Sequence, residues 1–262
     1  MTRPISLATA GLALCAVVAG TAHAAPKMLT PLADAPGPET ARILDRTPTQ
    51  NDTVVLGSVV KDTHTIIAGG SGSLAVGLLL GPLGVAANIA HADAVNQKRG
   101  ETVGALIHND TVGILKSVRA AEPEVAADVR AYELIPAVQL TFIDDTHFRV
   151  GCVLSASLAA TLSNGAQKPW HGRYWVRQYE TYDTASDASV TAAQGALTTC
   201  MAEANRLFER NARGQMTLSD TATTVDFYGK TVKLKLDDAD YPAHIVVPDP
   251  WGAAEWPQKP QG

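Results

Sequence analysis

The sequence lacks a basic surface. It has 21 Lys and Arg residues against 26 Asp and Glu residues, a formal net charge of −5, and only 18% of its 262 residues are charged. A protein that binds nucleic acid needs a basic patch or stripe to contact the phosphates. The composition therefore argues against a nucleic-acid partner, while an apolar fraction of 46% is ample for a hydrophobic core.

The sequence also lacks the short motifs of the commonest catalytic sites. It contains no CxxC, HExxH, GxSxG, GxGxxG or GxxxxGK[ST]. These spacings place the side chains and glycines of redox, zinc-protease, serine-hydrolase and nucleotide sites. Their absence favours a protein that is not an enzyme, and we expect neither a cofactor nor a metal ion.

Charge is missing altogether from one long window, because no Asp, Glu, Lys or Arg lies between Asp62 and Asp93. Within it, small residues recur at every fourth position: Gly69, Ser73, Gly77 and Gly81. On a helix this spacing makes a flat stripe that lets another helix, or a partner within a membrane, approach closely. The stripe therefore predicts a contact surface rather than a chemical site.

The Gly81-Pro82 pair interrupts this window, since proline cannot continue a helix without losing a hydrogen bond. We expect a glycine-zipper helical hairpin with arms near 65–80 and 83–107. Three roles stay open: packing against the domain or an oligomer partner, insertion into or along a membrane, and a single membrane span. An arm of 15 residues is about 22 Å long, short for a bilayer crossing.

The N-terminus has the features of a secretory signal peptide over residues 1–24. An apolar run follows Arg3, and Ala22-His23-Ala24 is a small-x-small cleavage site. Cleavage leaves 20 basic against 26 acidic residues, a net charge of −6. We expect export to the periplasm or beyond it, with membrane association through the hairpin.

Two cysteines, Cys152 and Cys200, remain after cleavage. Alternation of apolar and polar residues places Cys152 on the apolar face of a strand, and a 3-4 spacing places Cys200 on the apolar stripe of a helix. In an oxidising compartment such a pair suggests a disulfide. Two separate buried thiols fit the pattern equally well.

The rest of the chain predicts an α+β fold: an antiparallel sheet with helices packed on one face, plus the glycine-zipper hairpin near the N-terminus. Expected elements are a strand over 53–60, a short helix over 112–119, meander strands near 138–142, 148–154 and 172–182, a helix over 188–211 capped by Asp187, and a hairpin over 224–236. The expected divisions are a disordered leader (25–50), the strand with zipper hairpin and short helix (51–122), the α+β domain (123–247) and an irregular Pro-rich tail (248–262).

This order of elements, with the segment WHGRYWVRQYETYD at 170–183 followed by an apolar-faced helix, resembles periplasmic proteins of the curli-assembly and TolB N-terminal type. The resemblance covers residues 125–236 and the first strand. It implies an α/β protein of the cell envelope and implies no functional residue.

Two clusters are candidates for a site. Asp144, Asp145 and His147 suit acid–base or metal chemistry, although Asp and Thr are favoured in hairpin turns and alternate strand residues point in opposite directions. Trp170, Arg173 and Trp175 suit stacking of a sugar or peptide, although aromatic residues are common in ordinary strands.

From these features we expect an exported envelope protein of interaction or assembly type. It would contact a membrane, a partner helix or a second copy through the small-xxx-small hairpin. The alternatives are a small periplasmic hydrolase and a glycan- or peptide-binding protein.

Overall fold

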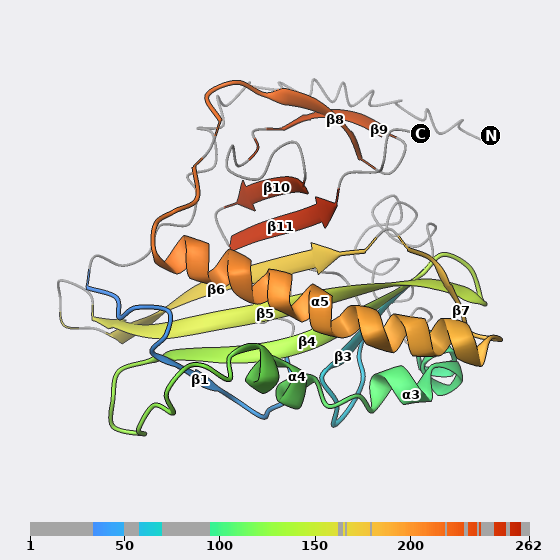
Figure 1. Ribbon diagram of the computed structural model, residues 1–262, viewed down its shortest axis with the longest axis horizontal. Coiled ribbons are helices and arrows are strands. Elements are labelled where there is room, and N and C mark those ends of the chain that lie inside the picture. Colours follow the sequence, from blue (N-terminus) through green and yellow to red (C-terminus); the bar gives the residue numbers. More distant parts are fainter. Residues whose placement is uncertain are drawn as a thin grey trace, which may run out of the picture.

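A three-stranded antiparallel meander forms the centre of the fold (Figure 1). Its strands are β4 (Tyr132–Phe142), β5 (His147–Thr161) and β6 (Gln167–Arg177). The computed structural model describes residues 34–49, 58–69, 95–161, 165, 167–178, 180–217, 219–227, 230–234, 236, 244–249 and 252–257.

Parallel strands extend the meander on both sides, so the sheet is mixed. On one side, β1 (Ala41–Ile43) and β3 (Thr65–Gly69) both pair with β4 in parallel, and β2 (Ser58–Val59) pairs with β3. On the other side, β11 (Gly252–Pro257) runs parallel to β6 and pairs with β10 (His244–Asp249). A short β7 (Tyr182–Asp183) pairs with β5, and β8 (Thr223–Phe227) with β9 (Lys230–Leu234) form a separate hairpin.

Helices lie on one face of this sheet, as the sequence predicts (Figure 1). They are α3 (Gly104–Ile107), α4 (Thr111–Val118) and α5 (Asp187–Ala212), and residues 95–102 are also helical. The hydroxyl of Ser186 accepts the hydrogen bond of the Ser189 backbone N–H and begins α5, so Asp187 is the first helical residue and not the cap.

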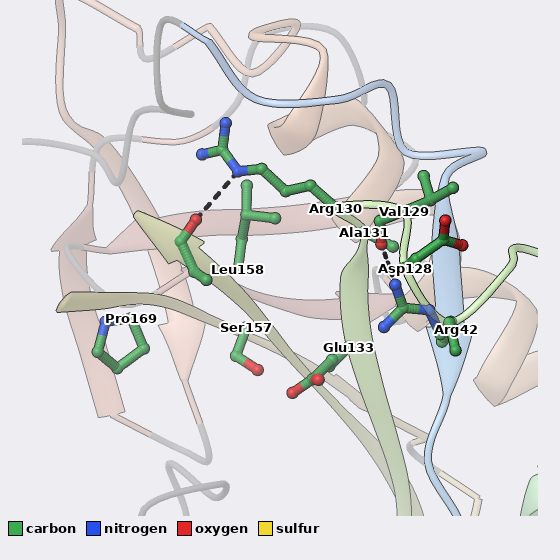
Figure 2. Close-up of a pocket in the computed structure, with 11 residues that line it drawn as sticks. Arg42, Asp128, Val129, Arg130, Ala131, Glu133, Ser157, Leu158 and Pro169 are labelled. Carbon is green, nitrogen blue, oxygen red and sulfur yellow. Dashed lines mark hydrogen bonds between the residues drawn. The ribbon is translucent and has the colours of Figure 1, made fainter. Parts of the chain in front are cut away.

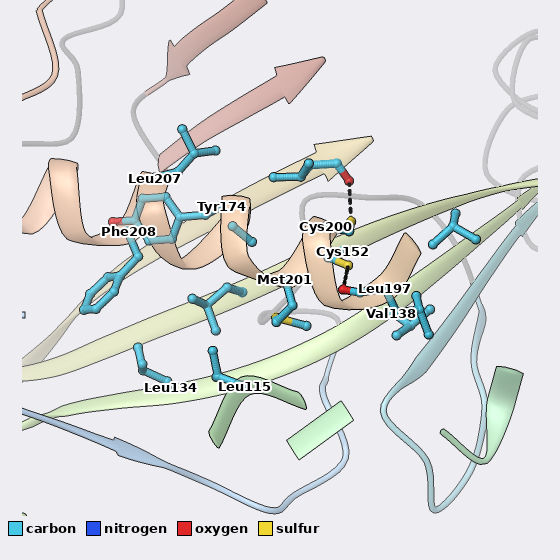
Figure 3. Close-up of a cluster of buried hydrophobic side chains, with 14 of the residues drawn as sticks. Leu115, Leu134, Val138, Cys152, Tyr174, Leu197, Cys200, Met201, Leu207 and Phe208 are labelled. Carbon is cyan, nitrogen blue, oxygen red and sulfur yellow. Dashed lines mark hydrogen bonds between the residues drawn. The ribbon is translucent and has the colours of Figure 1, made fainter. Parts of the chain in front are cut away.

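The core lies between α5 and the even-numbered residues of β4, β5 and β6, which point to the helices (Figure 3). Phe208 of α5 packs edge-to-face on Tyr132 and Tyr174, with ring centroids 5.1 and 5.7 Å apart. The odd-numbered residues of β4, β5 and β6 make up the opposite side, called the second face below. Because successive side chains of a strand point in opposite directions, the even-numbered residues of β4, β5 and β6 contact the helices and the odd-numbered residues lie on the second face.

Several segments differ from expectation. Residues 65–69, expected at the start of a helical arm, form strand β3, where Ile66 and Ile67 are fully buried. Part of the expected leader forms β1, and the expected irregular tail contains the last two residues of β10 and all of β11. The common reason is pairing with distant strands, which supplies hydrogen bonds that local sequence does not reveal.

Candidate functional site

A pocket of about 440 Å³ lies where β4 begins, β5 ends and β6 begins (Figure 2). The residues that line it are Arg42, Ala127, Asp128, Val129, Arg130, Ala131, Glu133, Ser157, Leu158, Ala159 and Pro169. Its volume falls in the range of about 300–1,000 Å³ that is usual for small-molecule sites.

Three strands build the polar side of the pocket. The parallel pairing of β1 with β4 sets Arg42 beside Glu133, and the antiparallel pairing of β4 with β5 sets Glu133 beside Ser157. Partners that are directly opposite on adjacent strands project from the same face. A guanidinium, a carboxylate and a hydroxyl therefore stand in one row on the second face.

Arg42 carries a charge that the protein only partly compensates. Its Nη2 donates to the carbonyl oxygen of Val129, whereas its Nε is buried and makes no hydrogen bond. In the part of the chain that the structure describes, no carboxylate forms an ion pair with Arg42. A partly buried charge without a counter-ion is costly, so Arg42 favours the arrival of an anionic group.

Arg130, the second cation of the pocket, already has hydrogen-bond and ion-pair partners within the protein. Its Nε donates to the carbonyl oxygen of Ala159 at 3.1 Å, and its Nη1 donates to Asp34 Oδ2 at 2.8 Å. The hydrogen bond and the charge of Arg130 hold the pKa of Asp34 below its usual value. Arg130 therefore holds the chain before β1 in place and forms a wall of the pocket.

The remaining lining is acidic and apolar. Glu133 and Asp128 are exposed. Val129 is 43% exposed, and among the described residues only Ile143 is another large hydrophobic side chain left so open. The pocket thus combines one uncompensated cation, two carboxylates, a hydroxyl and an exposed apolar surface.

The predicted acid–base cluster forms a turn. Asp144 Oδ1 accepts hydrogen bonds from the backbone N–H groups of Thr146 and His147 at 2.8 and 2.7 Å. The bond from Thr146, followed by that from His147, lowers the pKa of Asp144 to about 2. Asp145 pairs with Arg99, with Nη2 and Oδ1 3.1 Å apart. The arrangement matches the turn interpretation, and the described residues include no group of three or more His, Cys, Asp or Glu that would hold a metal ion.

The predicted stacking cluster is divided between the two sides of the sheet. Trp170 points to the helix layer and packs edge-to-face on Tyr132, with centroids 5.9 Å apart. Arg173 and Trp175 lie on the second face, where the guanidinium of Arg177 stands 4.2 Å from the Trp175 ring centroid. Odd and even residues of one strand point in opposite directions, so the three side chains do not form one surface.

The predicted glycine-zipper stripe lies mostly outside the described residues. Gly69 is the last residue of strand β3, so it does not belong to a helical stripe; Ser73, Gly77 and Gly81 lie outside the described residues, and their part of the stripe stays a prediction. Within the described segments, no helix is long and apolar enough to cross a membrane.

The two cysteines lie in the interface between α5 and the sheet, as both interpretations of the sequence require (Figure 3). Neither cysteine forms a disulfide: the Cys152 thiol donates to the carbonyl oxygen of Leu197 at 3.8 Å, and the Cys200 thiol donates to that of Val176 at 3.7 Å. The structure therefore corresponds to the separate-thiol alternative.

Sequence reasoning missed the pocket because its row of residues depends on long-range pairing. Arg42, Glu133 and Ser157 are far apart in the chain and belong to no common motif. The one local sign is the arginine in an otherwise apolar ARI segment, which becomes meaningful only when β1 pairs with β4.

Comparison with known proteins identifies no family for this chain. No protein-family model matches it, and no curated protein matches it. A solved structure from Caulobacter crescentus CB15, described as a "putative lipoprotein", is similar over 44% of this chain and 81% of its own, with 18% identity and a TM-score of 0.24. A likeness at this level establishes neither fold nor function, and the resemblance to curli-assembly and TolB-type proteins stays a prediction.

Proposed function

We propose that the protein is an exported interaction protein, without catalytic activity, that binds a small ligand in the pocket of Figure 2. The ligand carries an anionic group that pairs with Arg42. The observation that carries this proposal is the guanidinium of Arg42, which lines a cavity of about 440 Å³ with a buried Nε that lacks a hydrogen-bond partner.

Two further features support ligand binding at this place. Val129 and Pro169 give the pocket exposed apolar surface, which a ligand would remove from water. The pocket is framed by paired strands on one side and by the Arg130 contacts on the other, so it is largely formed before a ligand arrives.

The test is calorimetric titration of the full chain with two probes, L-leucine and N-acetyl-L-leucine, which both carry a carboxylate and an apolar side chain. We expect at least one to bind, and Arg42→Gln to weaken that binding roughly 10- to 100-fold, as the loss of a charge-assisted hydrogen bond implies. Arg206→Gln, which removes a cation on α5, is the matched control and should leave the affinity unchanged.

Circular dichroism and thermal unfolding of both variants show whether the fold survives the substitution. An Arg42→Gln protein that folds normally and binds either probe as tightly as the wild type would contradict the proposal. So would a wild-type protein that binds neither probe at millimolar concentration.

The export part of the proposal is supported by the signal-peptide pattern of residues 1–24. Protease treatment of intact and osmotically opened cells tests it. We expect protection in intact cells and digestion once the outer barrier is opened. Digestion only after complete lysis would place the protein inside the cell and refute export.

We further propose the hairpin contact with a membrane or partner helix, supported by the small residues Ser73, Gly77 and Gly81, which follow β3 at every fourth position of the sequence. Sedimentation with membranes, compared between the wild type and Gly77→Glu, tests it. We expect the charged residue to release the protein from the membrane fraction. A wild-type protein that is fully recovered as a free monomer argues against this contact.

A further inference from the structure

The charges in the pocket indicate more than an anionic ligand. We propose that the ligand is a zwitterion of the α-amino-acid class with an apolar side chain, whose carboxylate pairs with Arg42 and whose ammonium pairs with Glu133. This inference rests on the proposed function of the same pocket and names the chemistry of its ligand.

Arg42 and Glu133 are opposite charges in register on adjacent parallel strands, yet they form no ion pair. Opposite charges that face each other across strands ordinarily pair and stabilise the sheet. Here Nη2 of Arg42 donates a hydrogen bond to the Val129 carbonyl oxygen, and the Glu133 side chain is exposed. Figure 2 shows both side chains lining the same cavity. A ligand with one positive and one negative group would satisfy both.

The remaining charges around the cavity favour a zwitterion over a simple anion or cation. Asp128 adds a second carboxylate on the lining, which disfavours a ligand with several negative charges. The Arg130 guanidinium is held by Asp34 and the Ala159 carbonyl oxygen, so it does not offset the two carboxylates in the cavity. A simple cation, in turn, would leave Arg42 uncompensated.

The apolar part of the lining suits a hydrophobic substituent on the ligand. Val129 is 43% exposed, and Pro169 is also exposed on the rim. Burying these surfaces against an aliphatic side chain would add a favourable contribution that the ionic contacts alone do not supply.

The test compares three probes that share the leucine side chain and differ in charge: L-leucine, which is zwitterionic, N-acetyl-L-leucine, which keeps the carboxylate, and L-leucinamide, which keeps the ammonium. We expect L-leucine to bind the full chain at least 10-fold more tightly than either of the other two. Loss of a single charge-assisted contact has an effect of this order.

Two variants then assign each charge to its partner. Glu133→Gln should weaken L-leucine binding about 10-fold or more and leave N-acetyl-L-leucine unaffected, whereas Arg42→Gln should weaken both. Glu203→Gln, an acidic residue of α5, is the matched control for Glu133→Gln. Since Glu133 is exposed, its substitution is not expected to prevent folding, which thermal unfolding of the variant checks.

The outcomes separate this inference from the proposed function. If N-acetyl-L-leucine binds as tightly as L-leucine, and Arg42→Gln weakens both, the ligand is a simple anion: the zwitterion is refuted and the proposed function stands. If L-leucine binds and Glu133→Gln has no effect, the ammonium assignment is wrong. If no probe binds, both the inference and the proposed function fail.

Discussion

Arg119 is expected to be the side chain whose loss most weakens the attachment of the N-terminal segment. It is 6% exposed and follows α4 directly. Its Nη1 donates to Asn205 Oδ1 and its Nη2 to the Pro38 carbonyl oxygen, each at 2.6 Å. The carboxylates of Glu122 and Glu209 complete its surroundings. One guanidinium thus joins α4, α5 and the chain that leads into β1.

Replacement by alanine leaves those partners without their donor. Removing one member of a buried ion pair costs about 3–5 kcal/mol. The Glu122 and Glu209 side chains remain 23% and 24% exposed, so water can solvate them partly and the lower end is appropriate. We therefore expect Arg119→Ala to lower the free energy of unfolding by about 3 kcal/mol. At roughly 2–4 °C per kcal/mol for a chain of this size, Tm should fall by about 6–12 °C.

Urea and thermal unfolding followed by circular dichroism measure this change. The matched control is Lys61→Ala, because Lys61 pairs with Asp62 at 4.0 Å with side chains 92% and 84% exposed. A pair of this kind contributes about 0.5 kcal/mol or less. If the two variants lose the same stability, or if Arg119→Ala loses less than about 1 kcal/mol, Arg119 is not the link described above.

Three other predictions follow from the described contacts. Cys152 and Cys200 are buried and not joined by a disulfide, so both should resist alkylation in the native protein and both should react after unfolding without reductant. An unfolded protein that takes up no alkylating agent would instead contain a disulfide. The pKa of Asp144 is lowered to about 2, so the contribution of its carboxylate to stability is present above the ordinary pKa of 3.8 and is lost as the pH falls toward 2. Asp144→Ala should therefore lower the free energy of unfolding more at pH 7 than at pH 2. Equal losses at the two pH values would refute this. A Cβ on Gly195 of α5 would meet no atom within 4 Å, whereas one on Gly151 of β5 would lie 2.9 Å from the Val176 carbonyl oxygen. Gly195→Ala should raise stability by up to about 1 kcal/mol and Gly151→Ala should lower it by about 1–3 kcal/mol, which urea unfolding compares directly.

The parts of the fold that the sequence predicts well are those with a clear local period. Leu197, Cys200, Ala204 and Leu207 mark the buried stripe of α5, and all four are buried in the structure. The meander strands alternate apolar and polar residues in the same way. Local period decides α5 because the helix buries only one stripe. It decides the meander strands because the apolar residues that face the helices recur at every second position, although Ala137 and Val153 on the second face are buried as well.

Prediction fails where an element is buried or paired at long range. The TIIAG segment of β3 is a continuous apolar run, and periodicity does not distinguish a buried strand from a buried helix in so short a run. The C-terminal strand β11 ends at Pro257, and proline is compatible with a strand end although it suggests an irregular tail in isolation.

The sequence does not predict the pocket for a related reason. The pocket depends on contacts of residues 34–42, which lie in the segment expected to be a disordered leader. Asp34 binds Arg130, the Pro38 carbonyl oxygen binds Arg119, and Arg42 lines the cavity, so residues 34–42 connect the pocket with the core. A ligand that binds only the folded protein stabilises it, by about 2.7 kcal/mol at 100 times its dissociation constant. Because Arg119 positions the chain that leads to Arg42, Arg119→Ala should weaken ligand binding as well as stability, although it touches no part of the pocket. A variant that loses stability while binding with unchanged affinity would show that β1 is held in place by its pairing with β4 alone.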